Sequence, residues 1–216
     1  MDIILGAVIT VVILIYSAIL HEISHGLVAE RLGDPTARLM GRITLNPLPH
    51  IDPVMSILLP LILSLSPAHI IIGGAKPVPV DPFNFREPKK DMALVSLVGP
   101  ATNLLIAIVF ALICRFLFPG SPLDIIRSNG ILGFILGTIV YINILLAIFN
   151  LLPIPPLDGS KVIAQFLPDR EAAVYLSIGT FGILIIFFLL SFPIGGISLG
   201  GLILNLLTLS MNLLGL

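Results

Sequence analysis

Long apolar stretches alternate with short polar connections along the whole chain. Six stretches carry almost no charge, and each is long enough to cross a bilayer as a helix: 3–20, 54–72, 92–118, 131–152, 172–192 and 197–216. A hydrocarbon core roughly 30 Å thick needs about 20 helical residues to span it. The pattern therefore predicts an all-α membrane protein, a polytopic helical bundle of about five to six transmembrane segments in a single domain over residues 1–216.

Glycines and prolines mark the expected ends of these helices. The first helix is expected over 3–32, because Gly33 and Pro35 follow it. Residues 3–165 form the expected core of the domain, and 171–216 add further C-terminal helices. The other helices of the domain are expected over 91–118, 130–152, 171–192 and 196–215.

Two segments between the first long helices have the pattern of extended chain. Polar and apolar residues alternate over 37–45, which predicts a short strand. Prolines alternate with other residues over 73–80, where they exclude a helix. We therefore expect a small β-hairpin or strand element at one end of the bundle, the end assigned below to the cytoplasmic side.

Composition excludes several classes of protein. Hydrophobic residues make up 57% of the chain and charged residues only 11%, and the mean hydropathy is +1.14. A soluble domain carries about 25% charged residues, so a water-soluble fold is excluded. The net charge of −1 offers no basic field for nucleic acid. The single cysteine, Cys114, excludes a disulfide framework and is expected to be a small buried apolar residue.

The strongest chemical signal is the motif His21-Glu22-Ile23-Ser24-His25 at the end of the first apolar stretch. Residues four apart lie on one helical face, so both imidazoles can bind one metal ion. Glu22 lies beside them and can take a proton from a water molecule at that metal. Ionisable groups within a membrane helix are costly and are functional by default. The alternative is that they are interfacial polar residues at a helix end.

A catalytic zinc site needs a third protein ligand. His50 and His69 are weak candidates, because each lies among turn prolines without a motif. Asp158 is the better candidate, since it follows an apolar helix and the three prolines of 153–156. Irregular backbone at membrane depth persists only where it is buried in protein or borders a water-filled cavity. The alternative role for Asp158 is the N-cap of a following helix.

Two separated motifs resemble those of the site-2 protease family of intramembrane zinc metalloproteases: His21-Glu22-x-x-His25 and Asn150-x-x-Pro153-x-x-Pro156-Leu157-Asp158-Gly159. The segments 74–79 and 99–103, Gly-Ala-Lys-Pro-Val-Pro and Gly-Pro-Ala-Thr-Asn, are similar to family segments too. The resemblance implies Zn²⁺ bound by His21, His25 and Asp158, with Glu22 as general acid/base. It also implies that Asn150 helps to hold the substrate backbone. The chain is expected to be a short form without PDZ or CBS domains.

A shared metal also constrains the topology. If His25 and Asp158 lie at one depth, their helices run in the same direction and 91–118 returns between them. The run 54–72 then does not cross, and its prolines favour a re-entrant hairpin. With that topology nine basic residues lie on one side and two on the other, which places the active site towards the cytoplasm and the N-terminus outside. The protein is expected in the cell membrane of a prokaryote.

We interpret the chain as an intramembrane zinc metalloprotease that cleaves single-span membrane proteins in the lipid bilayer. Because a helical substrate does not expose its peptide bonds, the extended residues Gly74, Lys76, Pro77 and Val78 are expected to hold the unwound segment by strand addition; a plain surface hairpin is the alternative for that stretch. Two other functions stay open, an intramembrane metal-ion carrier and a non-catalytic membrane scaffold. A carrier would not need Glu22 beside the two histidines.

Overall fold

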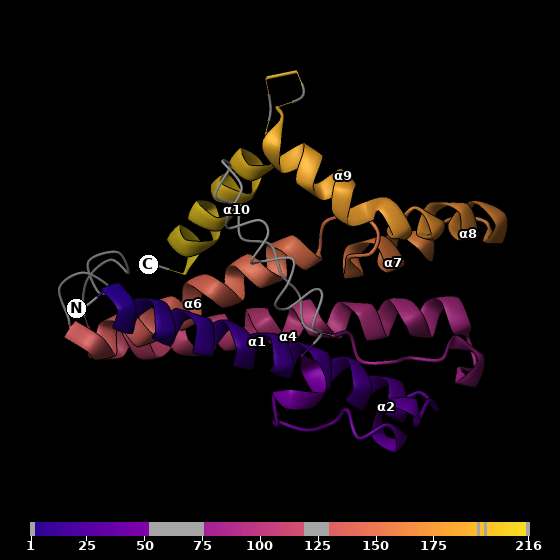
Figure 1. Ribbon diagram of the computed structural model, residues 1–216, viewed down its shortest axis with the longest axis horizontal. Coiled ribbons are helices and arrows are strands. Elements are labelled where there is room, and N and C mark those ends of the chain that lie inside the picture. The colour runs from indigo at the N-terminus through magenta and orange to yellow at the C-terminus, as the bar shows by residue number, and fades with distance from the viewer. Residues whose placement is uncertain (1–2, 52–75, 119–129, 194, 197, 215–216) are drawn as a thin grey trace.

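The computed structural model describes residues 3–51, 76–118, 130–193, 195–196 and 198–214. Three long helices lie side by side along the molecule, and two shorter ones, α9 and α10, arch over one face of this layer (Figure 1). The long helices are α1 (Ile3–Arg31), α4 (Pro88–Leu117) and α6 (Gly130–Asn150). The shorter elements are α2 (Thr36–Leu39), η1 (Leu48–His50), η3 (Pro82–Asn84), α7 (Asp158–Ala164), α8 (Asp169–Ser177), α9 (Gly179–Ser191) and α10 (Leu199–Leu213).

The core of the bundle lies where α4, α6 and α10 meet. Small residues on α4 allow a close approach of α6, and in a bilayer such packing replaces the hydrophobic effect as the force between helices. Cys114 belongs to this cluster and is buried, as the sequence predicts. The buried members are Ala107, Ala111 and Cys114 of α4, Leu136, Val140 and Ile144 of α6, and Leu207 and Met211 of α10.

The outer faces of the long helices are apolar and exposed. On α4, for example, Leu105, Leu112 and Phe116 expose 62%, 64% and 87% of their surface. An exposed apolar surface of this extent is unfavourable in water and suits the hydrocarbon of a bilayer. The three helices α1, α4 and α6 are each long and apolar enough to cross a membrane. The expected all-helical membrane core is therefore confirmed.

The expected number of five to six spans is not reached within the described residues. They contain the three long helices, or up to four spans if the bent pair of α8 and α9 counts as one. The stretch 171–192, expected as one helix, is bent by 68° between 177 and 181. Gly182 lies against the proline loop after α6, because a Cβ there would stand 1.7 Å from Pro155 O. This contact sets the direction of α9, which differs from a straight continuation of α8.

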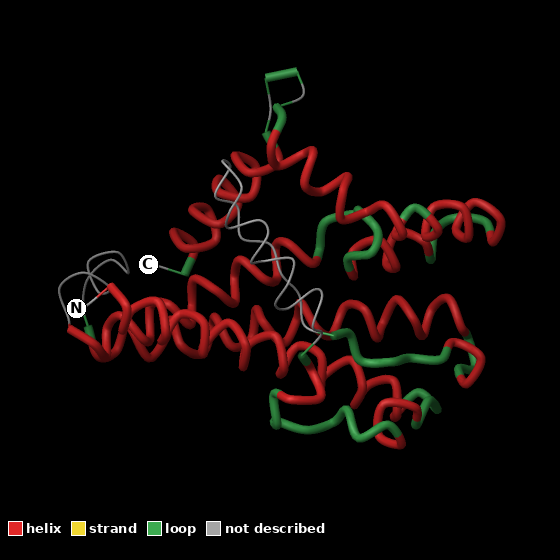
Figure 2. The backbone as a smooth tube through the Cα atoms, in the orientation of Figure 1, coloured by secondary structure: helices red, strands yellow, loops and turns green. Residues whose placement is uncertain are grey.

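The expected β-hairpin is wrong. Figure 2 shows helices and loops throughout the described ranges, with no strand among them. Over 37–45 the chain starts with the helical turn α2, since the Asp34 carboxylate accepts hydrogen bonds from the Thr36 backbone and side chain. Residues 76–81 form no strand, and Pro77 and Pro79 lack two of the N–H donors that a ladder needs.

Loops at the end of α1 meet the start of α4 and so close one end of the bundle. Asp34 accepts hydrogen bonds from Asp81 N at 2.8 Å and from Asn84 Nδ2 at 2.8 Å. Lys76 N donates to His50 O at 2.8 Å, and Arg42 donates to Lys76 O at 2.6 Å. The residues on either side of 52–75 therefore lie together. The run 54–72, expected to be re-entrant, lies outside the described residues.

Candidate metal centre

Two histidines of α1 supply the first two ligand atoms of the site. His21 and His25 follow one another on one helical face, and both are buried. Their Nε2 atoms are 3.0 Å apart and their rings meet edge to face at 86°. The spacing of four residues thus places both ring nitrogens at one point, as the motif predicts.

Asp158 reaches the same point from the first turn of α7. Its Oδ2 atom lies 3.1 Å from His21 Nε2 and 3.2 Å from His25 Nε2. Gly159 makes this approach possible, because a Cβ at that position would lie 2.2 Å from Leu151 O at the end of α6. The N-cap of α7 is Leu157, so Asp158 does not have the alternative capping role. Its other oxygen, Oδ1, accepts from Lys161 Nζ at 3.2 Å.

The second nitrogen of each imidazole contacts an oxygen. His21 Nδ1 lies 2.6 Å from Asn103 Oδ1, and His25 Nδ1 lies 2.7 Å from Val95 O. Both oxygens only accept hydrogen bonds, so each Nδ1 carries a proton, and a neutral ring then has its lone pair on Nε2. In the neutral form of the two rings, two nitrogen lone pairs and a carboxylate oxygen converge at 3.0–3.2 Å.

A cation bound between these three atoms would remove the repulsion between their lone pairs. In a tetrahedral zinc site with bonds of about 2.0–2.1 Å, neighbouring ligand atoms are about 3.3 Å apart. The separations observed among His21, His25 and Asp158 are close to that spacing. Within the described residues these three side chains are the one group suited to bind a metal ion, and all are buried. The donor set fits zinc.

Gly99 of α4 lies directly against the two imidazoles. A Cβ there would stand 2.5 Å from His25 Nε2 and 2.6 Å from His21 Cε1. No real side chain tolerates such contacts, so only glycine allows α4 to pack against the two rings. Pro100 follows inside the helix. The motif 99–103 therefore supplies both the close approach of α4 and the Asn103 acceptor.

Glu22 borders the same cavity as the three candidate ligands, which has a volume of about 260 Å³. Its Oε2 atom accepts a hydrogen bond from Val78 N at 2.7 Å. This bond fixes the carboxylate beside the metal position. The other residues around the cavity are Pro77, Val80, Met92, Val95, Ser96, Asn150, Pro156, Leu157 and Lys161.

The remaining candidates take different positions. Asn150 borders the cavity, but its Nδ2 donates to Leu146 O at 2.9 Å within its own helix. Pro77 and Val78 form part of the wall, whereas the backbone of Lys76 contacts His50 and Arg42. The His50 ring contacts Thr44 O at 3.0 Å and is not among the clustered ligands. Gly74 and His69 lie outside the described residues.

Sequence reasoning missed the polar groups behind the histidines. Asn103 and Asn143 are both fully buried, and Asn103 Nδ2 donates to Asn143 Oδ1 at 2.8 Å. Both stand in transmembrane helices, where polar residues are rare and mark function. That rarity, together with the motif 99–103, was the signal that could have found them.

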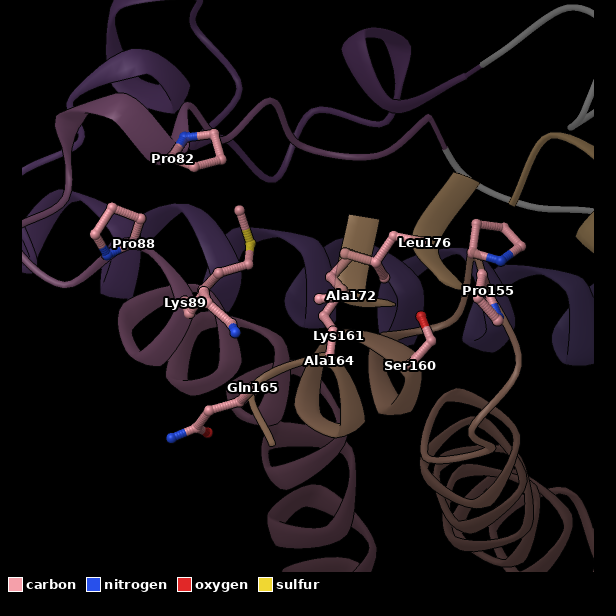
Figure 3. Close-up of a pocket in the computed structure, with 12 residues that line it drawn as sticks. Pro82, Pro88, Lys89, Pro155, Ser160, Lys161, Ala164, Gln165, Ala172 and Leu176 are labelled. Carbon is pink, nitrogen blue, oxygen red and sulfur yellow. The ribbon is translucent and has the colours of Figure 1, made fainter. Parts of the chain in front are cut away.

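A second cavity, of about 370 Å³, lies beside the first and is mostly apolar. The two share Met92, Pro156 and Lys161 in their linings. Figure 3 shows Ala164, Ala172 and Leu176 facing the space, with Pro155 at its edge. It has the chemistry to accommodate a large apolar side chain.

The fold and the site define a membrane-embedded metalloprotein with a buried two-histidine, one-carboxylate centre. Residues 9–192 match peptidase family M50, and the chain belongs to that family. It is 35% identical over 189 residues to YwhC of Bacillus subtilis, whose name marks it provisionally as a zinc metalloprotease, covering 86% of this chain and 81% of that protein.

A second relative, Rip2 of Mycolicibacterium smegmatis, carries the same provisional name. It is 31% identical over 179 residues, covering 82% of this chain and 64% of its own length. A segment of 69 residues is 46% identical to MJ0611 of Methanocaldococcus jannaschii, covering 32% of this chain and 31% of that protein. No solved structure matches.

Family membership confirms the resemblance to the site-2 proteases. The protein is an intramembrane zinc metalloprotease that acts on membrane-protein substrates. Nothing in the comparisons favours a metal-ion carrier or a scaffold.

Proposed function

We propose that His21, His25 and Asp158 bind the zinc ion and that Glu22 acts as general acid/base in cleaving an unwound single-span membrane protein. One observation carries the proposal: two Nε2 lone pairs and one carboxylate oxygen converge within 3.2 Å beside the Glu22 carboxylate. Zinc, when bound, supplies the Lewis acidity that polarises a carbonyl and acidifies water.

The position of Glu22 supports its proposed role in the proton transfers. It shares the 260 Å³ cavity with the ligands, and the Val78 N–H holds one of its oxygens at 2.7 Å. A positioned carboxylate takes the proton of the attacking water and later gives it to the leaving amine. The hydrogen bond from Val78 keeps the carboxylate oriented between these two steps.

Three residues of the cavity wall are proposed to contact the substrate backbone: Asn150, Pro77 and Val78. An asparagine amide both donates and accepts, which suits it to a peptide group. Its Nδ2 donates one N–H to Leu146 O, and the amide also has a second N–H and the Oδ1 acceptor. Because the Val78 N–H already donates to Glu22, the contact with Val78 is a wall contact rather than strand pairing.

The apolar cavity of about 370 Å³ is proposed to accept a large apolar side chain of the unwound substrate. It opens next to the metal cavity and shares Pro156 and Met92 with it. A side chain a few residues from the scissile bond can therefore enter it while the peptide bond lies at the metal. Transmembrane segments are rich in such side chains.

The active site is proposed to open towards the cytoplasm of a prokaryotic cell. Within the described residues, nine basic residues belong to the elements and loops around the end of α1 and the start of α4, whereas Arg115 lies in the last turn of α4. Lys and Arg are enriched in cytoplasmic loops. The nine basic residues are Arg31, Arg38, Arg42, Lys76, Arg86, Lys89, Lys90, Lys161 and Arg170.

Single cysteines at Thr44 and Asn84 test this orientation in a Cys114→Ala background. Both positions should be protected from a membrane-impermeant thiol reagent in intact cells and should react once the cells are opened. Labelling of one position alone in intact cells would mean that the segment between them crosses the membrane.

The function is tested with purified protein in detergent and a panel of single-span peptides, with and without a chelator. The wild type and Glu22→Gln should each contain about one zinc per chain, and His25→Ala should contain none. Cleavage should require zinc and fall about 10²- to 10⁴-fold in Glu22→Gln, since general acid/base catalysis has that magnitude. Full zinc content in His25→Ala, or substantial turnover by Glu22→Gln, would contradict the assignment.

A further inference from the structure

A chain of buried polar groups runs from His21 into the centre of the bundle and joins three membrane helices. His21 Nδ1 contacts Asn103 Oδ1 at 2.6 Å, and Asn103 Nδ2 donates to Asn143 Oδ1 at 2.8 Å. Asn143 Nδ2 then donates to Ser17 Oγ at 2.9 Å and to Ile139 O at 2.9 Å. Both asparagines are 0% exposed.

One backbone carbonyl determines the direction of every hydrogen bond in this series of buried polar groups. Ile139 O can only accept, so the end of the Asn143 amide that faces it must be the NH₂ group. The oxygen of Asn143 therefore faces Asn103 and requires the NH₂ group of that residue. The oxygen of Asn103 is left facing His21, where it requires a proton on Nδ1. The orientation of each amide thus follows from the chemistry of its partners.

We infer that Asn103, oriented by Asn143, is the positioning residue that holds His21 in its metal-binding tautomer. With the proton fixed on Nδ1, the lone pair of the ring stays on Nε2, which points at His25 and Asp158. The inference rests on the proposed function, in which His21 binds zinc. It adds that the tautomer is set through Asn103 by a side chain on α6, that of Asn143, which lies 40 residues after Asn103 in the sequence.

Comparison with His25 shows why only His21 needs a series of hydrogen bonds behind its Nδ1 acceptor. The Nδ1 atom of His25 contacts Val95 O, a backbone carbonyl of α4, at 2.7 Å. A backbone acceptor has a fixed direction and needs no further support. Asn103 is an amide that could rotate by half a turn and present its NH₂ group to the ring. The hydrogen bond to Asn143 Oδ1 prevents that rotation.

Three variants separate positioning from packing. Asn103→Leu removes the acceptor at similar size, and Asn103→Asp keeps an acceptor for Nδ1 but sets a second oxygen against Asn143 Oδ1. Asn143→Leu is the comparison one step away, because it removes more hydrogen bonds and releases the Asn103 amide, whose oxygen still reaches His21 Nδ1 in one of its two orientations. For each variant the zinc affinity is measured by competition with a chelator, and thermal stability is measured on the metal-free protein.

Asn103→Leu should weaken zinc binding by about 10- to 100-fold, the usual effect of removing a partner of a ligating histidine. Asn103→Asp should recover most of the affinity while lowering the stability of the metal-free protein. Asn143→Leu should lower that stability more than Asn103→Leu and the zinc affinity less. In the metal-free wild type, ¹⁵N shifts should show His21 protonated on Nδ1, with the signal identified by its loss in His21→Phe.

The inference is overturned if Asn103→Leu binds zinc like the wild type, or if the affinities of all three variants follow their stabilities. If Asn103→Leu does not fold, Asn103→Asp decides, because loss of zinc in proportion to stability contradicts positioning. His21→Ala distinguishes this failure from that of the proposed function. Zinc binding unaffected in His21→Ala removes the ligand assignment itself, whereas loss there with wild-type binding in Asn103→Leu removes only the inference.

Discussion

Replacing Gly99 by alanine tests whether the close approach of α4 shapes the metal centre. The added methyl would stand 2.5 Å from His25 Cε1 and Nε2 and 2.6 Å from His21 Cε1. Neither ring can move freely, because each Nδ1 is held at 2.6–2.7 Å by an oxygen of α4. Overpacking of this kind costs about 1–3 kcal/mol. If the rings bear that cost, zinc binding weakens by about 5- to 150-fold, since 1.4 kcal/mol is tenfold.

The assay is zinc affinity by chelator competition, followed by peptide cleavage at saturating zinc. Gly200→Ala in α10 is the matched control, because its added methyl has Leu190 Cδ2 as nearest neighbour at 4.0 Å. That variant should bind zinc like the wild type, and its helix should gain up to about 1 kcal/mol in stability. Wild-type zinc affinity and cleavage in Gly99→Ala would refute the reasoning, since the rings would then tolerate a shift of α4.

Three further predictions concern substrate binding and pH. Asn150→Leu should lower cleavage with little change in zinc content or melting temperature, because among the described residues the Asn150 amide hydrogen-bonds to Leu146 O of its own helix. Loss of zinc in this variant would show that the residue is structural. Ala164→Phe should fill the apolar cavity and shift the preferred substrate side chain from large to small, seen by mass spectrometry of peptide products; an unchanged preference would contradict the proposed subsite. Burial raises the pKa of Asp34, but hydrogen bonds from Thr36, Asp81 and Asn84 outweigh it and leave that pKa below its ordinary 3.8. The stability from this carboxylate is therefore present above about pH 4 and is lost as the pH falls through the lowered pKa. Thermal melts of Asp34→Asn and the wild type should converge in that acidic range, and a constant difference between them would refute the linkage.

The helices of the bundle could be predicted because each depends on its own residues. The first helix was expected over 3–32 and runs over 3–31, and the helix expected over 130–152 runs over 130–150. The bend between α8 and α9 depends instead on Gly182 meeting Pro155 O, a contact between separate elements. No pattern within 171–192 contains that information.

The prediction of a strand over 37–45 was wrong for a similar reason. Alternation of polar and apolar residues over 37–45 describes a local preference, which the Asp34 carboxylate overrides by turning the chain at Thr36. Asp34 in turn is held by Asp81 N, almost fifty residues away in the sequence. The prolines of 76–81 were interpreted correctly as preventing a helix, but they also remove donors that strand pairing needs.

The metal centre shows the same division between local and distant information. The spacing of His21 and His25 is a property of one helix, so the sequence predicts their shared face. Asp158 could be named from its motif, while its contact with both histidines depends on Gly159 passing Leu151 O. For Asn103 and Asn143 the sequence states only that polar groups lie in apolar helices. Because an unpaired amide in a bilayer is costly, each must have a partner, but only the packing of α1, α4 and α6 determines that the chain of partners ends at His21.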